Sequence, residues 1–274
     1  MNEVFSYTGV LFNGRDASAV EDVLAVEETL RISINDVPFT ITMRSPGSEE
    51  DLVTGLLFTE GIYRSAGQPM MEVTERNESG VITAMNIRIP EDELLKSFEG
   101  SRSIASASSC GLCGKTELEE LIAQTPRNFV MEPSLIASCF EKVSQQQLAF
   151  QKSGGTHAAG AFTRTGDVLC VREDIGRHNA VDKVIGALIR AGKLQEADGM
   201  TVSGRISYEI VSKAMNAGIP LLASVSAPSG KAVQTAMEAG MTILAFCRNE
   251  RFTAYTNPQR LQLNEFKSNV TKHV

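Results

Sequence analysis

Residues 199–247 read GMTVSGRISYEIVSKAMNAGIPLLASVSAPSGKAVQTAMEAGMTILAFC, and this stretch decides the fold. Three short apolar runs in it have the length of buried strands: Gly199–Ser203, Pro220–Val225 and Thr242–Cys247. The two segments between them, Ile206–Ala217 and Gly230–Ala239, carry apolar residues at helical spacing. Strands that alternate with helices predict a sheet covered by helices on its faces, which is an α/β fold.

The alternation extends toward the N-terminus as far as about Pro133. A helix is expected over Leu135–Phe150 and another over Arg177–Ala191. Two strands are expected between these helices, over His157–Phe162 and Asp167–Arg172. Residues 129–274 are therefore predicted to form one α/β domain.

The part before residue 129 has a different pattern. Apolar and polar residues alternate over Glu28–Asn35 and Val37–Met43, which predicts a hairpin that turns at Asn35-Asp36. A helix is expected to begin at Ser48, with Asp51 at the capping-box position. It should end near Gly61, and residues 81–89 should form a further strand. Residues 1–128 are thus predicted to form a smaller, β-rich domain that ends in a loop.

The composition limits the classes of function. The chain has 274 residues, of which 42 % are hydrophobic, and a net charge of −7. Such a chain can form a globular core, and its negative charge argues against binding nucleic acid or an anionic membrane. Residues 1–14 lack the pattern of a signal peptide, and the apolar runs are too short to span a bilayer. Five cysteines without regular spacing favour reduced thiols, so a cytoplasmic protein is expected.

The strongest chemical motif is Cys110-Gly111-Leu112-Cys113-Gly114-Lys115, which lies in a Ser- and Ala-rich loop over residues 100–114. Two such thiols can share a metal, form a disulfide or pass sulfur between them. A helix is expected near Lys115, and its N-terminus and the ammonium group would favour the nucleophilic thiolate. The remaining cysteines stand in apolar patterns and are expected in the core: Cys139, Cys170 and Cys247.

Zinc sites and redox pairs use the same spacing of two cysteines, but the surrounding sequence favours neither. A structural zinc site normally needs a second cysteine pair, which the sequence does not contain. A thioredoxin-like pair should directly follow a strand, whereas a small-residue loop precedes Cys110. The motif could also be a turn with incidental cysteines, but free cysteines normally occur in apolar segments.

Basic residues recur where predicted strands lead into helices or turns. They are Arg177, Arg205, Lys231, Arg248 and Arg251. Residues 129–274 hold 16 Lys and Arg against 12 Asp and Glu, whereas residues 1–128 hold 10 against 21. His178 stands at a predicted helix N-terminus, which favours its neutral form and also suits an anion. If the strands present these ends on one edge of the sheet, a nucleotide is the expected ligand. In Ser153–His157, two adjacent glycines would allow a ligand or another backbone to come close, but taken alone the segment is interpreted as a tight turn.

Eight segments spread over the chain are similar to the FdhD family. They are NDVPFTITMRSPG at 35–47, DLVTGLLFTEGI at 51–62, SSCGLCGK at 108–115, SGGTHAAGAF at 153–162, EDIGRHNAVDKVIG at 173–186, SGRISYEIVSKA at 203–214, SVSAPSGKAV at 224–233 and FCRNERF at 246–252. The resemblance covers nearly the whole chain, and several of the segments are long.

The resemblance implies a sulfur carrier. Family members accept persulfide sulfur from a cysteine desulfurase and pass it to the molybdenum bis(molybdopterin guanine dinucleotide) cofactor of formate dehydrogenase. By the same resemblance, Cys110 bears the persulfide and Cys113 is the second motif cysteine. The cofactor-binding stretch falls on Phe246, Cys247, Arg248, Asn249, Glu250 and Arg251. A cytidine-deaminase-like α/β/α core and a homodimer are also implied, and GDP or GMP should mimic the cofactor's guanosine ends.

Two alternatives remain. A zinc-dependent deaminase would have H-x-E at one helix start and P-C-x-x-C at the next. This chain has His178-Asn179-Ala180 at the first position and no cysteine over residues 203–207 at the second, so no zinc is expected. The other alternative is a cofactor-binding chaperone without catalysis, whose thiols sense redox state.

Overall fold

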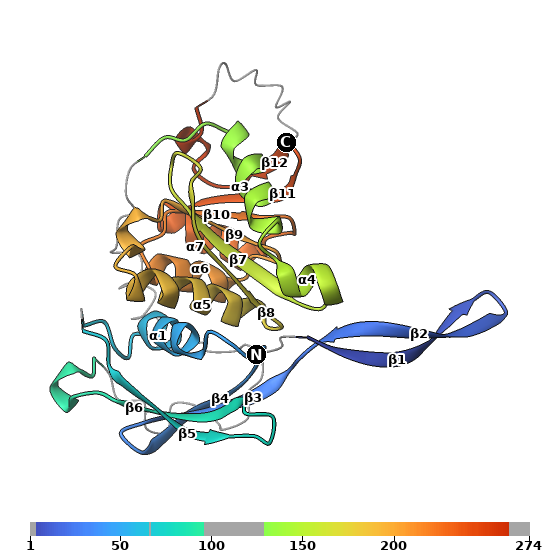
Figure 1. Ribbon diagram of the computed structural model, residues 1–274. Helices are drawn as coiled ribbons and strands as arrows, with labels where there is room; N and C mark the ends of the chain where they lie inside the picture. Colours follow the sequence, from blue (N-terminus) through green and yellow to red (C-terminus); the bar gives the residue numbers. More distant parts are fainter. Residues whose placement is uncertain (1–3, 66, 96–128, 263–274) are drawn as a thin grey trace.

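The computed structural model describes residues 4–65, 67–95 and 129–262 (Figure 1). Cys110 and Cys113 lie outside these residues. The strands are β1 (Val4–Asn13), β2 (Asp16–Ala25), β3 (Glu28–Ile34), β4 (Val37–Arg44), β5 (Met70–Arg76), β6 (Ile82–Arg88), β7 (His157–Phe162), β8 (Val168–Asp174), β9 (Gly199–Val202), β10 (Leu221–Ser224), β11 (Thr242–Arg248) and β12 (Arg251–Ala254). The α-helices are α1 (Glu49–Thr59), α3 (Ser134–Ser144), α4 (Leu148–Ser153), α5 (Arg177–Arg190), α6 (Tyr208–Asn216) and α7 (Gly230–Glu238).

A six-stranded sheet with the order β12-β11-β10-β9-β7-β8 organises the C-terminal part. Strands β9, β10 and β11 are parallel, whereas β7 runs antiparallel to both β8 and β9. Consequently β8, β9, β10 and β11 all run in the same direction. The predicted α/β class is confirmed, although the sheet is mixed rather than purely parallel.

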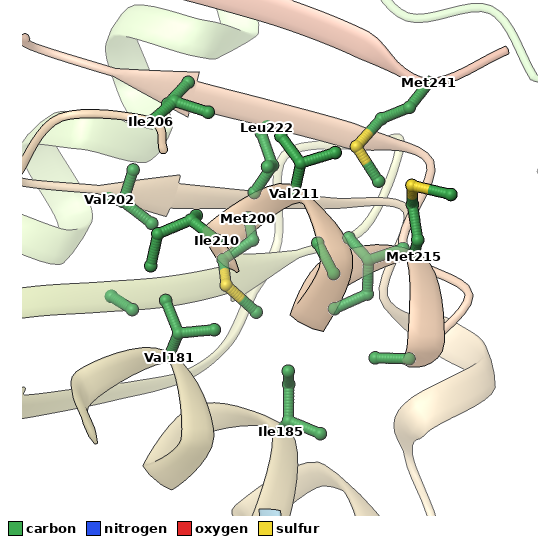
Figure 2. Close-up of a cluster of buried hydrophobic side chains, with 14 of the residues drawn as sticks. Val181, Ile185, Met200, Val202, Ile206, Ile210, Val211, Met215, Leu222 and Met241 are labelled. Atoms are coloured by element: carbon green, nitrogen blue, oxygen red, sulfur yellow. The ribbon is translucent and has the colours of Figure 1, made fainter. Parts of the chain in front are cut away.

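Helices α5, α6 and α7 cover one face of this sheet. Figure 2 shows the core beneath them, where Val181 and Ile185 of α5 and Ile210 of α6 meet Met200 and Leu222 of the sheet. Alternate residues on β10 point to opposite faces, as strand geometry requires, so Leu221 belongs to the core on the other side. That second face is covered by α3, and the C-terminal part therefore has three layers.

The helix expected over Leu135–Phe150 is wrong in its extent, because α3 and α4 are separate helices. The carboxylate of Glu173 on β8 accepts hydrogen bonds from the backbone N–H groups of Ala149 and Phe150, at 2.9 and 2.7 Å. It thereby satisfies free donors at the start of α4, much as a capping side chain does. The sequence between the two helices contains no helix breaker, and a tertiary contact of this kind cannot be recognised from the local sequence pattern.

A four-stranded sheet, β4-β3-β6-β5, packs on α1. The expected turn at Asn35-Asp36 is confirmed, because both residues have positive φ values, 50° and 68°, as a type I′ hairpin turn requires. The expected cap at Ser48 is wrong, because Ser48 has φ 55° and its side chain caps nothing. Instead, Glu49 in the first turn accepts a hydrogen bond from the Gly47 N–H and pairs with Arg44 at 3.0 Å.

Helix α1 joins this sheet to the rest of the molecule, because it lies between β3 and α5 (Figure 1). The two helices cross at Gly55 and Gly186, where an added Cβ would lie 1.9 and 1.8 Å from a carbonyl oxygen of the opposite helix. Asp51 of α1 pairs with Arg172 at 2.8 Å and with Arg190 at 2.6 Å. Part of the positive charge of residues 129–274 therefore neutralises the acidic N-terminal part. The predicted boundary at residue 128 falls outside the described residues.

Strands β1 and β2 form a hairpin that projects from the body (Figure 1). This hairpin was not predicted from the sequence. None of the described helices combines the length and the apolarity needed to cross a membrane.

Candidate functional site: a basic sheet edge

The C-terminal ends of β8, β9, β10 and β11 gather at one edge of the six-stranded sheet, because these strands run in the same direction. Helices α5, α6 and α7 begin at this edge, after β8, β9 and β10 respectively. The nucleotide prediction required that the strands present these ends on one edge of the sheet, and they do. Open α/β sheets generally bind their ligands at such an edge.

His157, Ser203 and Arg177 come together at its centre. His157 begins β7, and its Nδ1 lies 3.1 Å from the Ser203 Oγ at the end of β9. The same Oγ accepts the Ala158 N–H at 2.9 Å. Gly204 leaves the space that the two larger side chains use, because a Cβ there would lie 3.3 Å from Arg177 Cδ and 3.4 Å from His157 Cε1.

Arg177 is the residue at this edge whose surroundings best suit an anion. Its Nε is buried and has no hydrogen-bond partner among the described residues. A buried guanidinium nitrogen without a partner is costly, and an anion at this position would satisfy it. Arg177 is the first residue of α5, whose Gly176 N-cap has no side chain to cover the helix's first N–H groups. Charge and backbone donors thus converge on one place.

His157 and His178 are held neutral. Burial and then the neighbouring Arg177 charge lower the pKa of His157. The same two causes, followed by Lys213, lower the pKa of His178 to about 4. The His178 Nε2 lies 3.4 Å from the hydroxyl of Ser207, the N-cap residue of α6. Neutral imidazoles can accept as well as donate hydrogen bonds, so these two side chains suit a polar, uncharged group of a ligand.

A row of hydrogen-bonded loops extends the edge from Gly204 to β11. Ser224 Oγ donates to the Gly204 carbonyl at 2.7 Å, and the Ser226 N–H donates to Ser224 Oγ at 2.9 Å. The Phe246 N–H then donates to the Ser226 carbonyl at 3.2 Å. Phe246 has φ 56° at an irregularity in β11, and its ring is exposed. A strained backbone at an aromatic residue is uncommon and often marks a ligand contact.

The other predicted cofactor residues lie along the same edge. Arg205, Lys231, Arg248, Asn249, Glu250 and Arg251 are exposed there. Arg248 and Arg251 stand opposite each other across β11 and β12. No ion pair of these basic residues is found within residues 4–65, 67–95 and 129–262. Facing like charges are unfavourable unless an anion lies between them.

Cys247 does not face this edge. Its side chain is buried in the core under α3, and burial raises the pKa of its thiol to about 12. Only its backbone could contact a ligand. Cys139 and Cys170 are also buried or half-buried thiols whose pKa burial raises to about 11. At neutral pH these three thiols are protonated and poor nucleophiles.

The stretch 173–183 is rich in polar and charged groups. Some of these residues hold the fold together, and others lie at the candidate site. Asp174 is fully buried and pairs with Lys183 at 2.8 Å, while Asn179 donates to the Met43 carbonyl at 2.8 Å. These residues hold α5 against the N-terminal sheet. Arg177 and His178, by contrast, lie at the basic sheet edge, where they could contact a ligand. Among the described residues, no three His, Cys, Asp or Glu side chains gather as a metal site.

His157 was not predicted as a site residue, because Ser153–His157 was interpreted as a turn. The structure shows that His157 joins the site through the pairing of β7 with β9, a contact between distant parts of the chain. The local signals were the adjacent Gly154 and Gly155 and a polar side chain at the start of an apolar strand.

A sequence model of the FdhD/NarQ family matches residues 25–262. The chain belongs to the FdhD/NarQ family. The sulfur carrier protein FdhD of Anaeromyxobacter dehalogenans is 40 % identical over 268 residues, which are 91 % of this chain and 92 % of the relative. The sulfur carrier protein FdhD of Sulfolobus acidocaldarius is 39 % identical over 246 residues, which are 89 % of this chain and 92 % of the relative.

A solved structure supports the fold of this FdhD/NarQ chain. The crystal structure described as a formate dehydrogenase accessory protein from Desulfotalea psychrophila superposes with a TM-score of 0.77 at 22 % identity. The match covers 95 % of this chain and all of the other. The arrangement of sheets and helices is therefore shared, and the basic sheet edge lies within it.

Proposed function

We propose that this protein is a cytoplasmic sulfur carrier that takes persulfide sulfur on Cys110 and delivers it to a molybdenum cofactor held at the basic sheet edge. Family membership supports the sulfur-carrying part, since the relatives are named sulfur carrier proteins. Formate dehydrogenase is the proposed client, in line with the description of the structural neighbour. Cys110 is the proposed carrier because the described thiols, Cys139, Cys170 and Cys247, are poor nucleophiles.

The observation that carries the ligand-binding part is the buried Nε of Arg177 at the start of α5, which has no hydrogen-bond partner among the residues that the structure describes. A guanidinium group and free helix N–H groups match the oxygens of a phosphate. The molybdenum bis(molybdopterin guanine dinucleotide) cofactor carries phosphates between its pterin and guanosine ends, so it would be bound as the substrate. The neutral His157 and His178 would meet an uncharged polar group, and Phe246 offers a ring for stacking.

The sulfur chemistry is a pair of exchanges. The Cys110 thiolate attacks the outer sulfur of a desulfurase persulfide, so the desulfurase cysteine leaves as a thiolate and Cys110 becomes a persulfide. In one proposed second step, the Cys113 thiolate attacks the inner sulfur of that persulfide. A Cys110–Cys113 disulfide forms, hydrosulfide leaves toward molybdenum, and a dithiol reductant must later reduce the disulfide. Cys113 could instead relay the outer sulfur or protect the persulfide.

The three-layer arrangement of the C-terminal part is compatible with a cytidine-deaminase-like core, and we propose that relationship for the fold. Deamination is not proposed. His178 lies near the Ser207 hydroxyl rather than near a cysteine, and neither Asn179 nor Ala180 can act as the general acid.

The proposed function is tested in cells that lack their own copy of this protein. Formate dehydrogenase activity should return when the natural chain is expressed and should stay absent with Cys110→Ala. Cys170→Ser is the matched control, because its half-buried thiol is protonated at neutral pH and should not carry sulfur. Full activity with Cys110→Ala would contradict a carrier role and favour the chaperone alternative.

A further inference from the structure

Ser203 is held in a fixed position just beyond the end of β9. Its backbone N–H donates to the Ala158 carbonyl at 2.9 Å, and its Oγ accepts the Ala158 N–H, also at 2.9 Å. The side chain thus takes the place of the backbone carbonyl that would continue the pairing of β7 with β9 beyond Ala159 and Val202. These two hydrogen bonds fix the Oγ, which lies 3.1 Å from the Nδ1 of His157.

The hydrogen bonds of the Ser203 hydroxyl decide where its proton lies. A hydroxyl has one proton to donate and two lone pairs that accept. A backbone N–H can only donate, so the Ala158 N–H uses one lone pair. Within the described parts of the chain, the one remaining partner of the hydroxyl is the His157 Nδ1. A proton on the Oγ that points to Nδ1 satisfies both groups, whereas a proton on Nδ1 would leave the hydroxyl proton without an acceptor.

This bond determines the tautomer of His157. A neutral imidazole that accepts at Nδ1 carries its proton on Nε2. Burial and the neighbouring Arg177 charge favour the neutral ring, because both lower its pKa. The ring and the arginine share the space that Gly204 leaves, since a Cβ there would lie 3.4 Å from His157 Cε1 and 3.3 Å from Arg177 Cδ. His157 therefore presents an N–H donor beside the guanidinium group.

We propose that Ser203 is a positioning residue that fixes the tautomer of His157, so that the Nε2–H donates to an uncharged acceptor oxygen of the ligand. This inference rests on the proposed function and names the kind of group that the site selects beside the phosphate. The phosphate itself is met by Arg177 and the first N–H groups of α5. A hydroxyl, carbonyl or ether oxygen satisfies the His157 donor, whereas a ligand N–H in the same place would face another N–H.

Ser203 acts through His157 and not on the ligand, because its proton and one lone pair are already used inside the protein. Ser203→Ala removes the hydroxyl that donates to Nδ1. The ring can then carry its proton on either nitrogen, so Nε2 presents a lone pair in part of the molecules. Ser203→Thr keeps the hydroxyl and suits the end of a strand.

Nitrogen NMR of the ligand-free chain at neutral pH measures the tautomer. The chain has three histidines, and the signal that disappears in His157→Gln identifies His157. We expect the proton on Nε2 in the natural chain and in Ser203→Thr, and a mixture of both tautomers in Ser203→Ala. A proton on Nδ1 in the natural chain would overturn the inference.

Titration calorimetry with GDP and with inorganic pyrophosphate measures the effect on binding. Ser203→Ala should weaken GDP binding by about threefold to tenfold, the effect of one neutral hydrogen bond, and Ser203→Thr should restore it. Pyrophosphate binding should not change, because this probe offers only phosphate groups. In a His157→Leu background, Ser203→Ala should have no further effect. Ser212→Ala is the matched control, since its hydroxyl donates to the Tyr208 carbonyl within α6 at 3.0 Å.

The outcomes separate this inference from the proposed function. Equal GDP affinities for the natural chain and Ser203→Ala would overturn the inference alone, and so would an equal loss of pyrophosphate affinity. If the natural chain binds neither probe, the ligand edge of the proposed function is wrong and the inference falls with it. Circular dichroism and the thermal midpoint identify a variant that fails to fold, and the tautomer of the natural chain then decides.

Discussion

Arg177 is the residue whose replacement should affect ligand binding most. Its Nε is buried without a partner among the described residues, whereas Arg205 and Lys231 are exposed to water. A charge-assisted hydrogen bond contributes roughly 1.5–3 kcal/mol, and less where water screens it. Arg177→Ala should therefore weaken GDP binding by about tenfold or more, whereas Lys231→Ala should weaken it by less than about threefold.

Titration calorimetry at fixed salt measures both affinities. Arg177→Lys is the matched variant, since it keeps the charge but loses the planar donor arrangement, and we expect an affinity between those of Ala and Arg. No GDP binding at millimolar concentration, or equal affinities for all variants, would show that the ligand edge is wrongly assigned.

His178 should make stability depend on pH. Burial, followed by the charges of Arg177 and Lys213, lowers its pKa to about 4, compared with 6.5 for an ordinary histidine. The unfolded chain therefore binds a proton that the folded chain does not bind between these two values. The stability due to neutral His178 is fully present above pH 6.5 and is lost as the pH falls toward about 4.

His178→Gln removes this titration, so its urea midpoint should fall less steeply between pH 6.5 and about 4 than that of the natural chain. Urea unfolding at a series of pH values gives the comparison. Parallel curves for the two proteins would mean that His178 is not held neutral by the fold.

Single residues at the site were partly foreseeable. Arg177 and His178 stood out because a helix start after a strand is visible in the sequence. Phe246 was expected from the family resemblance alone, and His157 was missed. Both lie at the edge through contacts across the sheet, with Ser226 and Ser203 respectively. Such contacts follow from strand order, which local patterns do not encode.

The α1–α5 crossing is the element-scale feature most sensitive to substitution. Ala normally stabilises a helix relative to Gly by about 1 kcal/mol. At Gly55 and Gly186 the added Cβ would collide with backbone carbonyls of the opposite helix at 1.9 and 1.8 Å. Gly55→Ala or Gly186→Ala should therefore lower the free energy of unfolding by about 3 kcal/mol, as overpacked cores do.

Urea unfolding measures this loss. Gly230→Ala is the matched control at the start of α7, where an added Cβ meets nothing within 4 Å. It should be neutral or slightly stabilising. If Gly55→Ala behaved like Gly230→Ala, the close approach of α1 and α5 would be refuted.

Helices and strands whose apolar residues recur at a clear spacing were predicted well, and those whose limits depend on tertiary contacts were not. The alternation in residues 199–247 predicted β9, α6, β10, α7 and β11 within a few residues. The division between α3 and α4 depends on Glu173, which lies 23 residues beyond Phe150. The β1–β2 hairpin was missed although Asn13-Gly14 is a turn signal, because apolar residues on both of its faces hide the alternation.

At the scale of the whole molecule, the acidic N-terminal part is bound to the basic C-terminal part by buried contacts. Lys213 of α6 pairs with Glu60, which follows α1, at 3.3 Å, and Thr59 of α1 donates to the Asp182 carboxylate of α5 at 2.8 Å. The charge asymmetry of the sequence thus has two causes. One is this internal contact, and the other is the set of basic residues left at the ligand edge.

Whether Cys110 carries sulfur is tested most directly by mass spectrometry after incubation with a cysteine desulfurase and cysteine. The peptide containing Cys110 should gain the mass of one sulfur atom, sensitive to a thiol reductant. Peptides containing Cys139, Cys170 or Cys247 should gain none, since burial keeps these thiols protonated. An unmodified Cys110 peptide, or an equal sulfur load on Cys110→Ala, would contradict the proposed carrier role.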